Sequence, residues 1–315
     1  MLTDLHIHSV FSDGQLELDD LTAIYSKGDI IALTDHNSTD AWEQASALCQ
    51  RAGIRWIAGL ELQLRGQPDY LVYFPLFDSD RGAVEEFRKS VKALARADHQ
   101  LSRAVYQKCF GFADFEANFD RAKNTSNTRV DFCTTKLLAE MITTRQPDVD
   151  VATVRQSKGA YLDALKVGST AAREWWQELL IASEDEKWAF SLSERFGGQI
   201  VLAHPLREMM RKVRNDFQCT EPAEALDNIF ASFFRRGGQC IELCLHNEQF
   251  LRDTSGFSKD LVEYSQKLVA LADAHRFEVV TGSDLHGNKA FARAMRDEMT
   301  RLTDAGHPRF PRWLT

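Results

Sequence analysis

The sequence predicts an α/β protein built on a parallel sheet, and three observations support this fold class. Seven short apolar runs have the length and composition of buried strands. Helical patterns separate most of these runs, and such β–α alternation is typical of a parallel sheet. Most of the runs end in histidine or a carboxylate, as strands do where an active site lies at their carboxyl ends. The predicted strands are residues 4–9, 29–36, 55–62, 69–76, 198–205, 239–246 and 277–286.

The predicted helices lie between these strands, and several of them end at glycine, a common helix terminator. Residues 18–28, 39–53 and 258–276 have helical patterns and precede the second, third and seventh strands. The final residues, GHPRFPRWLT, are expected to form a tail packed on the surface of the domain.

The β–α rhythm stops between residues 81 and 187, where long helical patterns occur with few strand signals. We therefore predict a barrel formed by residues 1–80 and 188–315, with 81–187 as a helical insertion (cap) domain. The insertion is either a structural cap or a lid that shapes substrate access. Aromatic residues of the insertion and its edge have two possible roles, packing in a core and stacking on a base. They include Trp175, Trp176 and Trp188.

Composition narrows the function classes. The chain has 315 residues and a formal net charge of -8, with 46 acidic and 38 basic side chains, so no global basic field recruits nucleic acid or an anionic membrane. Neither a secretion leader nor a run of about 18 apolar residues is evident, so we expect a cytoplasmic protein that does not contact a membrane. The 6 cysteines form no CxxC pair and are expected to be reduced.

The first predicted strand, in DLHIHS, carries two histidines one residue apart. Alternate side chains of a strand share a face, so His6 and His8 should project together while Leu5 and Ile7 face the other way. Two adjacent imidazoles can chelate a metal ion.

Six further metal-capable residues lie at or just beyond the ends of predicted strands. Imidazole and carboxylate donors together suit zinc, manganese or iron better than calcium. Eight donors exceed one tetrahedral site, so two or three divalent ions are expected, with Glu61 as the natural bridging carboxylate. The candidate metal ligands are His6, His8, Asp13, His36, Glu61, His204, Asp284 and His286.

These motifs carry a family resemblance. DLHIHSVFSDG, ALTDHN, AGLEL, VLAHP and GSDLHG resemble the successive motifs of the PHP (polymerase and histidinol phosphatase) metal-dependent phosphoesterases. The resemblance spans residues 1–77 and 190–290 and implies a distorted (β/α)7 TIM-like barrel with up to three metals. An insertion between the third-strand glutamate and the AHP motif is typical of the branch that resembles nucleoside 3',5'-bisphosphate phosphatases and 5'-to-3' exoribonucleases.

The resemblance also implies how the ligands are shared. One ion would be held by His6, His8, Glu61 and Asp284, another by Asp13, His36 and His286, and a third by Glu61 with His204. The family usually supplies one more histidine from strand four, in a segment of the type His-Leu-Leu-Gly. This sequence has Asp69-Tyr70-Leu71-Val72 there, so Asp69, Tyr70 or a water would have to complete the third site, or only two ions bind firmly.

The implied activity is hydrolysis of a phosphomonoester by metal-activated water. The substrate would be a small phosphorylated molecule such as a nucleotide, a nucleoside bisphosphate or the 5' end of a short RNA. Arg207 is either a holder of a phosphate oxygen or a solvated helix arginine. His246, at the end of the sixth strand, is a candidate proton donor to the leaving group or a substrate contact. The basic cluster of Arg207, Arg211, Lys212 and Arg214 is a candidate seat for a second phosphate or an oligonucleotide backbone.

Two other classes stay open at this point. An amidohydrolase-type enzyme that cleaves a C–N or C–O bond also begins with HxH, although such enzymes commonly have eight strands and a lysine or glutamate on strand four. A non-catalytic metal-binding or regulatory module is the second alternative. The sequence does not determine the phosphate ester or the oligomeric state.

Overall fold

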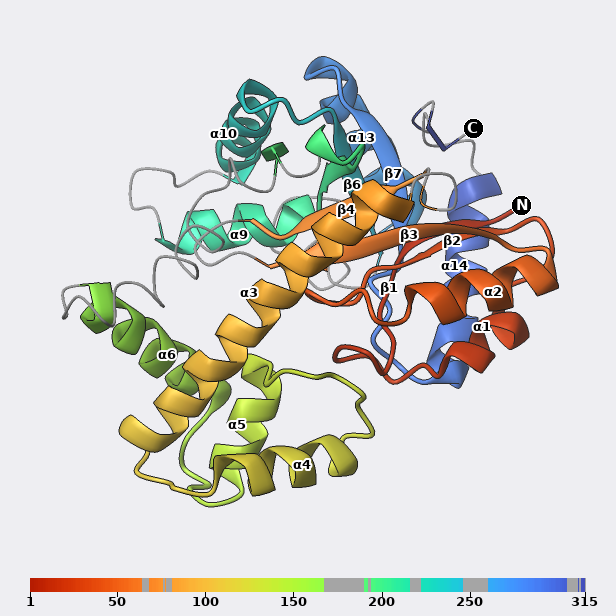
Figure 1. The fold of residues 1–315 in the computed structure, drawn as a ribbon. Helices are drawn as coiled ribbons and strands as arrows, with labels where there is room; N and C mark the ends of the chain where they lie inside the picture. Colours follow the sequence, from red (N-terminus) through yellow and green to blue (C-terminus); the bar gives the residue numbers. More distant parts are fainter. Residues whose placement is uncertain are drawn as a thin grey trace.

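The computed structural model describes residues 1–63, 68–75, 77, 81–166, 190–191, 194–215, 222–245, 260–304, 311 and 313–314. All seven predicted strands are present, and they form one sheet in chain order (Figure 1). The third strand has the predicted bounds, and the other six are somewhat shorter than their predicted runs. The strands are β1 (Thr3–Ile7), β2 (Ile30–Leu33), β3 (Arg55–Leu62), β4 (Tyr70–Phe74), β5 (Gln199–Leu202), β6 (Cys240–Cys244) and β7 (Glu278–Gly282).

The sheet curves into a nearly closed barrel because β7 returns to β1. A bridge joins Ile7 to Leu285, just beyond β7. The His8 amide donates to Leu285 O at 2.9 Å, and the Leu285 amide donates to His6 O at 3.3 Å. The predicted seven-stranded TIM-like barrel is therefore confirmed.

The expectation of a parallel sheet is wrong for β4, which runs antiparallel to both β3 and β5. Leu62 at the end of β3 pairs with Tyr70 at the start of β4. The short connection between them has no room for the dozen or more residues that a parallel crossover needs. As a consequence, the amino end of β4 lies at the same end of the barrel as the carboxyl ends of the other strands.

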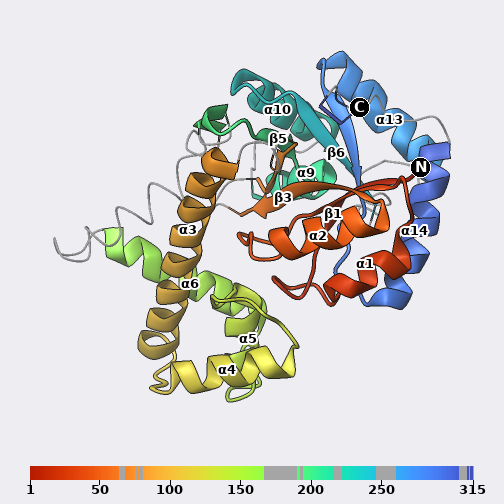
Figure 2. The same ribbon diagram turned by 45° about the vertical axis from the view of Figure 1, so that its right-hand side comes forward.

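Helices cover the outside of the barrel (Figure 2). Apolar residues of these helices, such as Leu21, Ala45 and Phe230, form one cluster with outward-facing strand residues such as Ile31 and Leu243. The helices predicted at 18–28, 39–53 and 258–276 are all present, with shorter bounds. The covering helices are α1 (Leu18–Ile24), α2 (Trp42–Ala52), α9 (Pro205–Asn215), α10 (Pro222–Arg235), α13 (Leu261–Ala274) and α14 (Lys289–Asp304).

The inserted region extends away from the barrel on one long helix (Figure 1). Its helices share a hydrophobic cluster of their own, with Tyr106, Phe119 and Leu138 among its buried members. The tryptophans at 175, 176 and 188 lie outside the described residues, and the domain boundaries at 81 and 187 stay a prediction. The inserted helices are α3 (Arg81–Lys108), α4 (Phe115–Thr125), α5 (Thr135–Thr143) and α6 (Val151–Lys166).

The barrel interior is filled by a cluster to which all seven strands contribute, and the end of the chain joins it. Leu314 is buried in this cluster, and Arg55 donates a hydrogen bond from Nη1 to Leu314 O at 2.6 Å. The prediction of a tail on the surface of the domain is therefore wrong for Leu314. Burial of its apolar side chain beside Trp313 is more favourable than exposure to water.

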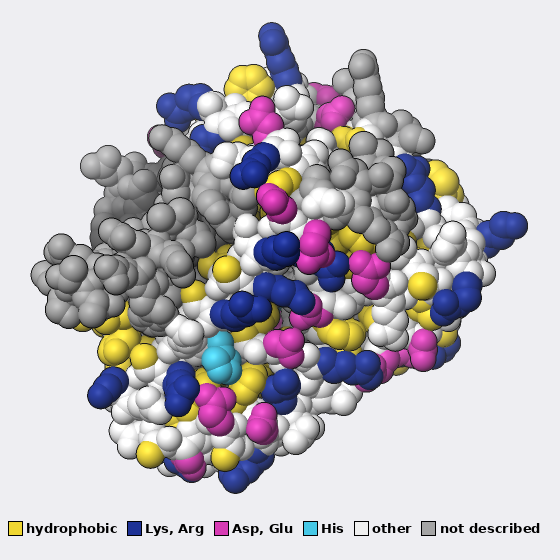
Figure 3. Space-filling model, in the orientation of Figure 1, with side chains coloured by type: hydrophobic (Ala, Val, Ile, Leu, Met, Phe, Trp, Pro, Cys, Tyr) yellow, Lys and Arg dark blue, Asp and Glu magenta, His cyan; other side chains and the backbone are white. Residues whose placement is uncertain are grey.

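Three further sequence expectations concern membrane helices, cysteines and surface charge in the part of the chain that the structure describes. None of its helices combines the length and apolar character needed to cross a membrane. The five cysteines within the described residues are free thiols. On the face drawn in Figure 3, basic and acidic side chains are interspersed, in agreement with the absence of a global basic field.

Candidate metal centre

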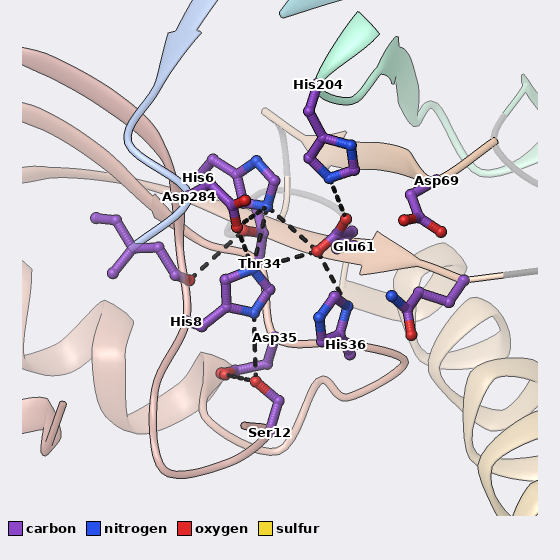
Figure 4. Close-up of polar contacts among 12 residues, drawn as sticks. His6, His8, Ser12, Thr34, Asp35, His36, Glu61, Asp69, His204 and Asp284 are labelled. Atoms are coloured by element: carbon purple, nitrogen blue, oxygen red, sulfur yellow. Dashed lines mark hydrogen bonds and ion pairs between the residues drawn. The ribbon is translucent and has the colours of Figure 1, made fainter. Parts of the chain in front are cut away.

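The structure brings all eight candidate ligands together at one end of the barrel. The donors fall into three groups in which the ligand atoms lie within 4.8 Å of one another. The imidazoles of His6, His8, His36 and His204 converge on Glu61, which stands at the centre (Figure 4). The groups are His6, His8, Glu61 and Asp284; His8, Asp13, His36 and His286; and Glu61, Asp69 and His204.

His6 and His8 project together as predicted, but the alternation of side chains does not extend to Leu5. The register of β1 against β2 shifts between Asp4 and Ile7, at a β-bulge or a similar irregularity. Leu5 consequently packs inside the barrel whereas Ile7 packs against the outer helices, so the expectation that these two share a face is wrong. Bulges commonly redirect side chains beside active sites.

The first group, His6, His8, Glu61 and Asp284, has the dimensions of a tetrahedral site. His6 Nε2 lies 3.1 Å from His8 Nε2, 3.2 Å from Glu61 Oε2 and 3.4 Å from Asp284 Oδ1. His8 Nε2 lies 3.2 and 3.3 Å from the same two oxygens. Ligands at about 2.0–2.1 Å from a tetrahedral ion are about 3.3–3.4 Å apart, so a zinc-sized cation fits these donors.

Glu242, a buried carboxylate that sequence reasoning missed, orients His6. His6 Nδ1 lies 2.7 Å from Glu242 Oε1, so Nδ1–H donates to Glu242 and the lone pair of Nε2 faces the first group. The other oxygen of Glu242 accepts a hydrogen bond from the His204 amide at 2.8 Å. The available signal was a single acidic residue within the apolar run CIELC of β6.

The second group is more exposed and surrounds Asp13. Asp13 Oδ1 lies 3.2 Å from His286 Nε2, 3.6 Å from His36 Nε2 and 3.7 Å from His8 Nδ1. A neutral imidazole offers one lone pair, and His8 Nε2 already faces the first group, so Asp13, His36 and His286 remain for a second ion. Asp13 Oδ1 is buried, and the three closest nitrogen atoms named here all belong to imidazoles.

The third group combines Glu61 and His204 with Asp69. His204 Nε2 lies 2.8 Å from Glu61 Oε1. Of the two residues that could replace the family histidine on strand four, Asp69 lies at this site. Tyr70 instead packs in the outer cluster, stacked on Phe233 with ring centroids 6.0 Å apart. Asp69 reaches the site because β4 is antiparallel and begins where its neighbours end.

The buried histidines and carboxylates shift one another's pKa values strongly. Burial alone would lower the pKa of His36, but Glu61 and Asp13 outweigh it and raise this pKa to about 10. Burial would raise the pKa of Glu61, yet His36 and His6 hold it well below its ordinary value. Asp13 is also held below its ordinary pKa, by His36 and His286 against the effect of burial. In the absence of cations, the cluster therefore stores protons on its imidazoles.

Two of the candidate ligands have left-handed backbone conformations, which are unfavourable for residues other than glycine. The φ angles are 28° at His204 and 51° at Asp284. Each such residue costs about 1–3 kcal/mol and persists only where its surroundings hold it. Here Asp4 holds the residue before Asp284: Ser283 donates to Asp4 from its amide at 2.9 Å and from Oγ at 2.8 Å.

Of the residues predicted to contact substrate, the structure places Arg207 and Arg211 and does not describe the others. Arg207 lies in the first turn of α9 with Nη1 3.4 Å from His204 Nε2 and Nη2 3.8 Å from Asp69 Oδ2, so its guanidinium faces the third group. Arg211 pairs with Glu208 at 3.4 Å. His246 and the side chains of Lys212 and Arg214 lie outside what the structure describes.

Comparison with known proteins agrees with this architecture. A family model described as the PHP domain matches residues 4–188, more than half of the chain. No curated protein matches the chain. A similar fold occurs in an amidohydrolase from Chromobacterium violaceum with bound sulfate, which is 20% identical with a TM-score of 0.55 over 91% of this chain and 88% of that chain.

A second solved structure, of a proposed metal-dependent phosphoesterase from Bifidobacterium adolescentis, is 18% identical with a TM-score of 0.53 over 90% of this chain and 87% of that chain. At such identities the two structures show a common fold. The match to the family model covers the motifs from His6 to Glu61, so it is stronger evidence of family membership than the two structures are. On this match, the chain belongs to the PHP domain family.

Proposed function

We propose that this chain is a metal-dependent phosphoesterase that hydrolyses a phosphomonoester. The observation that carries the proposal is the gathering of three groups of nitrogen and oxygen donors at one end of the barrel, two of which share the buried carboxylate of Glu61. Family membership and the phosphoesterase description of one structure of similar fold support it. The proposed substrate is a nucleotide, a nucleoside 3',5'-bisphosphate or the 5' end of a short oligonucleotide, as in the branch that the insertion resembles.

The proposed ligand sets follow the three groups. Asp69 joins Glu61 and His204 in the third set, and Glu61 is shared between the first and third sets. Mixed imidazole and carboxylate donors favour zinc, manganese or iron. The other proposed ligands are His6, His8 and Asp284 in the first set and Asp13, His36 and His286 in the second.

Divalent ions bound there would lower the pKa of a water to near neutrality and neutralise the phosphoryl oxygens. Around them, the protein's own groups orient the substrate. Arg207 faces the third group and is proposed to bind a non-bridging phosphate oxygen through its fork of N–H donors. His246, which follows β6, is proposed to contact the substrate or protonate the leaving group.

A second candidate is hydrolysis of a C–N or C–O bond, because one structure of similar fold is described as an amidohydrolase. The same donor groups would suit that chemistry. The two candidates differ in their product: only the phosphoesterase releases inorganic phosphate.

The test begins with metal analysis of the purified protein. Release of phosphate is then measured with manganese added, on simple phosphomonoesters, nucleoside 3',5'-bisphosphates and 5'-phosphorylated short RNA, beside a panel of amides and carboxylic esters. We expect phosphate release that Asp284→Ala abolishes and that Arg207→Ala weakens mainly through a higher KM. Arg235→Ala, a change to an arginine that bonds Ala231 O within α10, is the matched control. Less than one ion per chain together with no phosphate release would refute the proposal.

A further inference from the structure

The inserted region contacts the loop that carries Asp13, although the two are more than 110 residues apart in the chain. The Arg129 amide donates to Val10 O at 2.6 Å. Thr128 Oγ1 lies within hydrogen-bond distance of Val10 O, at 3.0 Å, and of Ser12 O, at 2.7 Å. Lys136 Nζ donates to Asp13 O at 3.2 Å. Three carbonyl groups of residues 10–13 are thus bonded by the insertion.

The same segment also anchors the far end of the loop. Arg129 Nη2 pairs with Glu17 Oε2 at 2.6 Å, and Asn127 Nδ2 donates to Glu17 Oε1 at 3.3 Å. The Arg129 guanidinium lies 5.7 Å from the centre of the Phe11 ring. The insertion therefore contacts the chain both before Asp13, at Phe11, and after it, at Glu17.

The barrel holds the opposite side of this loop. Asp35 Oδ1 accepts a hydrogen bond from the Ser9 amide at 2.7 Å. It accepts another from Ser12 Oγ at 2.6 Å (Figure 4). Gly14 lies so close to His8 that an added Cβ would be 2.4 Å from the His8 carbonyl carbon. The loop is therefore held by contacts with the barrel on one side and with residues 127–136 of the insertion on the other.

We propose that residues 127–136 position Asp13, with Thr128 and Lys136 as positioning residues, so that ion binding by the second group depends on the insertion. The inference rests on the ligand sets proposed above. The side chain of Asp13 is 21% exposed, more than the side chains of the first group, which are 0–1% exposed. Partners that orient ligands in this way typically contribute about 10- to 100-fold to metal affinity. The insertion is then part of the metal site and not only a cap over it.

The experiment is a titration of metal-free full-length protein with Mn²⁺ or Co²⁺ by calorimetry, which needs no substrate. Thr128→Val removes the hydroxyl donor and is expected to weaken one binding event at least ten-fold while the others stay unchanged. Thr128→Ser keeps the hydroxyl and should bind as the parent does. Thr125→Val is the matched control, because Thr125 Oγ1 donates to Arg121 O within α4.

Lys136→Met is a second variant, at an exposed position, in case Thr128→Val disturbs folding, and it should weaken the same event. Unchanged ion binding in both Thr128→Val and Lys136→Met, with the parent binding its full complement, would overturn this inference alone. A parent protein that binds no ion would instead refute the proposed function together with the inference.

Discussion

Asp69 is the residue at which this chain departs most clearly from the motif that it resembles. Its side chain is 8% exposed and shares a donor group with Glu61 and His204. A carboxylate in place of an imidazole adds a negative charge, which favours harder cations such as manganese at the third site. We therefore expect Asp69 to change which ion the proposed third site prefers without removing that site.

Asp69→Asn is expected to lower the number of bound ions by one, because an amide keeps the shape of the side chain but loses the charge. Ion content is measured by elemental analysis after dialysis against a small excess of manganese. Asp40→Asn, at a carboxylate that pairs with Lys92 at 2.9 Å, is the control and should bind as many ions as the parent. Equal ion content in Asp69→Asn and the parent would exclude Asp69 as a ligand.

At the scale of elements, the site depends on the close approach of β1, β6 and β7. Gly282 at the end of β7 leaves the room in which Glu242 reaches His6. An added Cβ there would lie 2.1 Å from Glu242 Oε1 and 2.5 Å from His6 Cβ. Contacts this short require the strands or the Glu242 side chain to move.

Gly282→Ala is therefore expected to break the hydrogen bond between Glu242 and His6 and to lower metal affinity at least ten-fold, with a lower melting temperature. Both are measured by titration and thermal unfolding. Gly28→Ala serves as the comparison, because its Cβ would meet nothing within 4 Å and only the left-handed backbone, with φ of 91°, is strained. That variant should lose stability by about 1–3 kcal/mol yet keep its metal affinity. Normal affinity in Gly282→Ala would show that this contact does not support His6.

At the scale of the whole molecule, the barrel gathers onto one face charges that come from both ends of the chain. Without cations, the folded protein compensates the carboxylates by protonating histidines, since the pKa values of His6, His204 and His286 are raised, as is that of His36. Ions can replace those protons only when the imidazoles are neutral. Stability, pH and metal content are therefore linked.

In the metal-free protein, the pKa of His36 is about 10 when folded and has an ordinary value of 6.5. The folded chain thus keeps a proton that the unfolded chain releases, and the resulting stabilisation is complete below pH 6.5 and is lost as pH rises toward 10. We expect the melting temperature in EDTA to fall between pH 6.5 and 9, and the increase caused by added metal to grow over the same range.

Thermal unfolding with and without EDTA measures both effects. His36→Asn should flatten the decline in EDTA, whereas His275→Asn, at a histidine that pairs with Asp227, should not. A melting temperature in EDTA that rises with pH across this range would contradict the expectation.

The sequence by itself determined the seven strands and the eight residues that converge in the structure. Strand periodicity and metal-capable residue types are local properties, readable within each short run. For the same reason, the branch, the substrate and the boundaries of the insertion stay predictions, since no local pattern decides them.

Only the tertiary structure decided the direction of β4, and with it the presence of Asp69 and not Tyr70 at the site. It also decided the contact between His6 and Glu242, which are 236 residues apart, and the contact of Thr128 with the loop of Asp13. These features depend on which distant segments the closed barrel and its insertion bring together. Packing of the whole chain sets that choice, and neither periodicity nor residue type within one segment reports it.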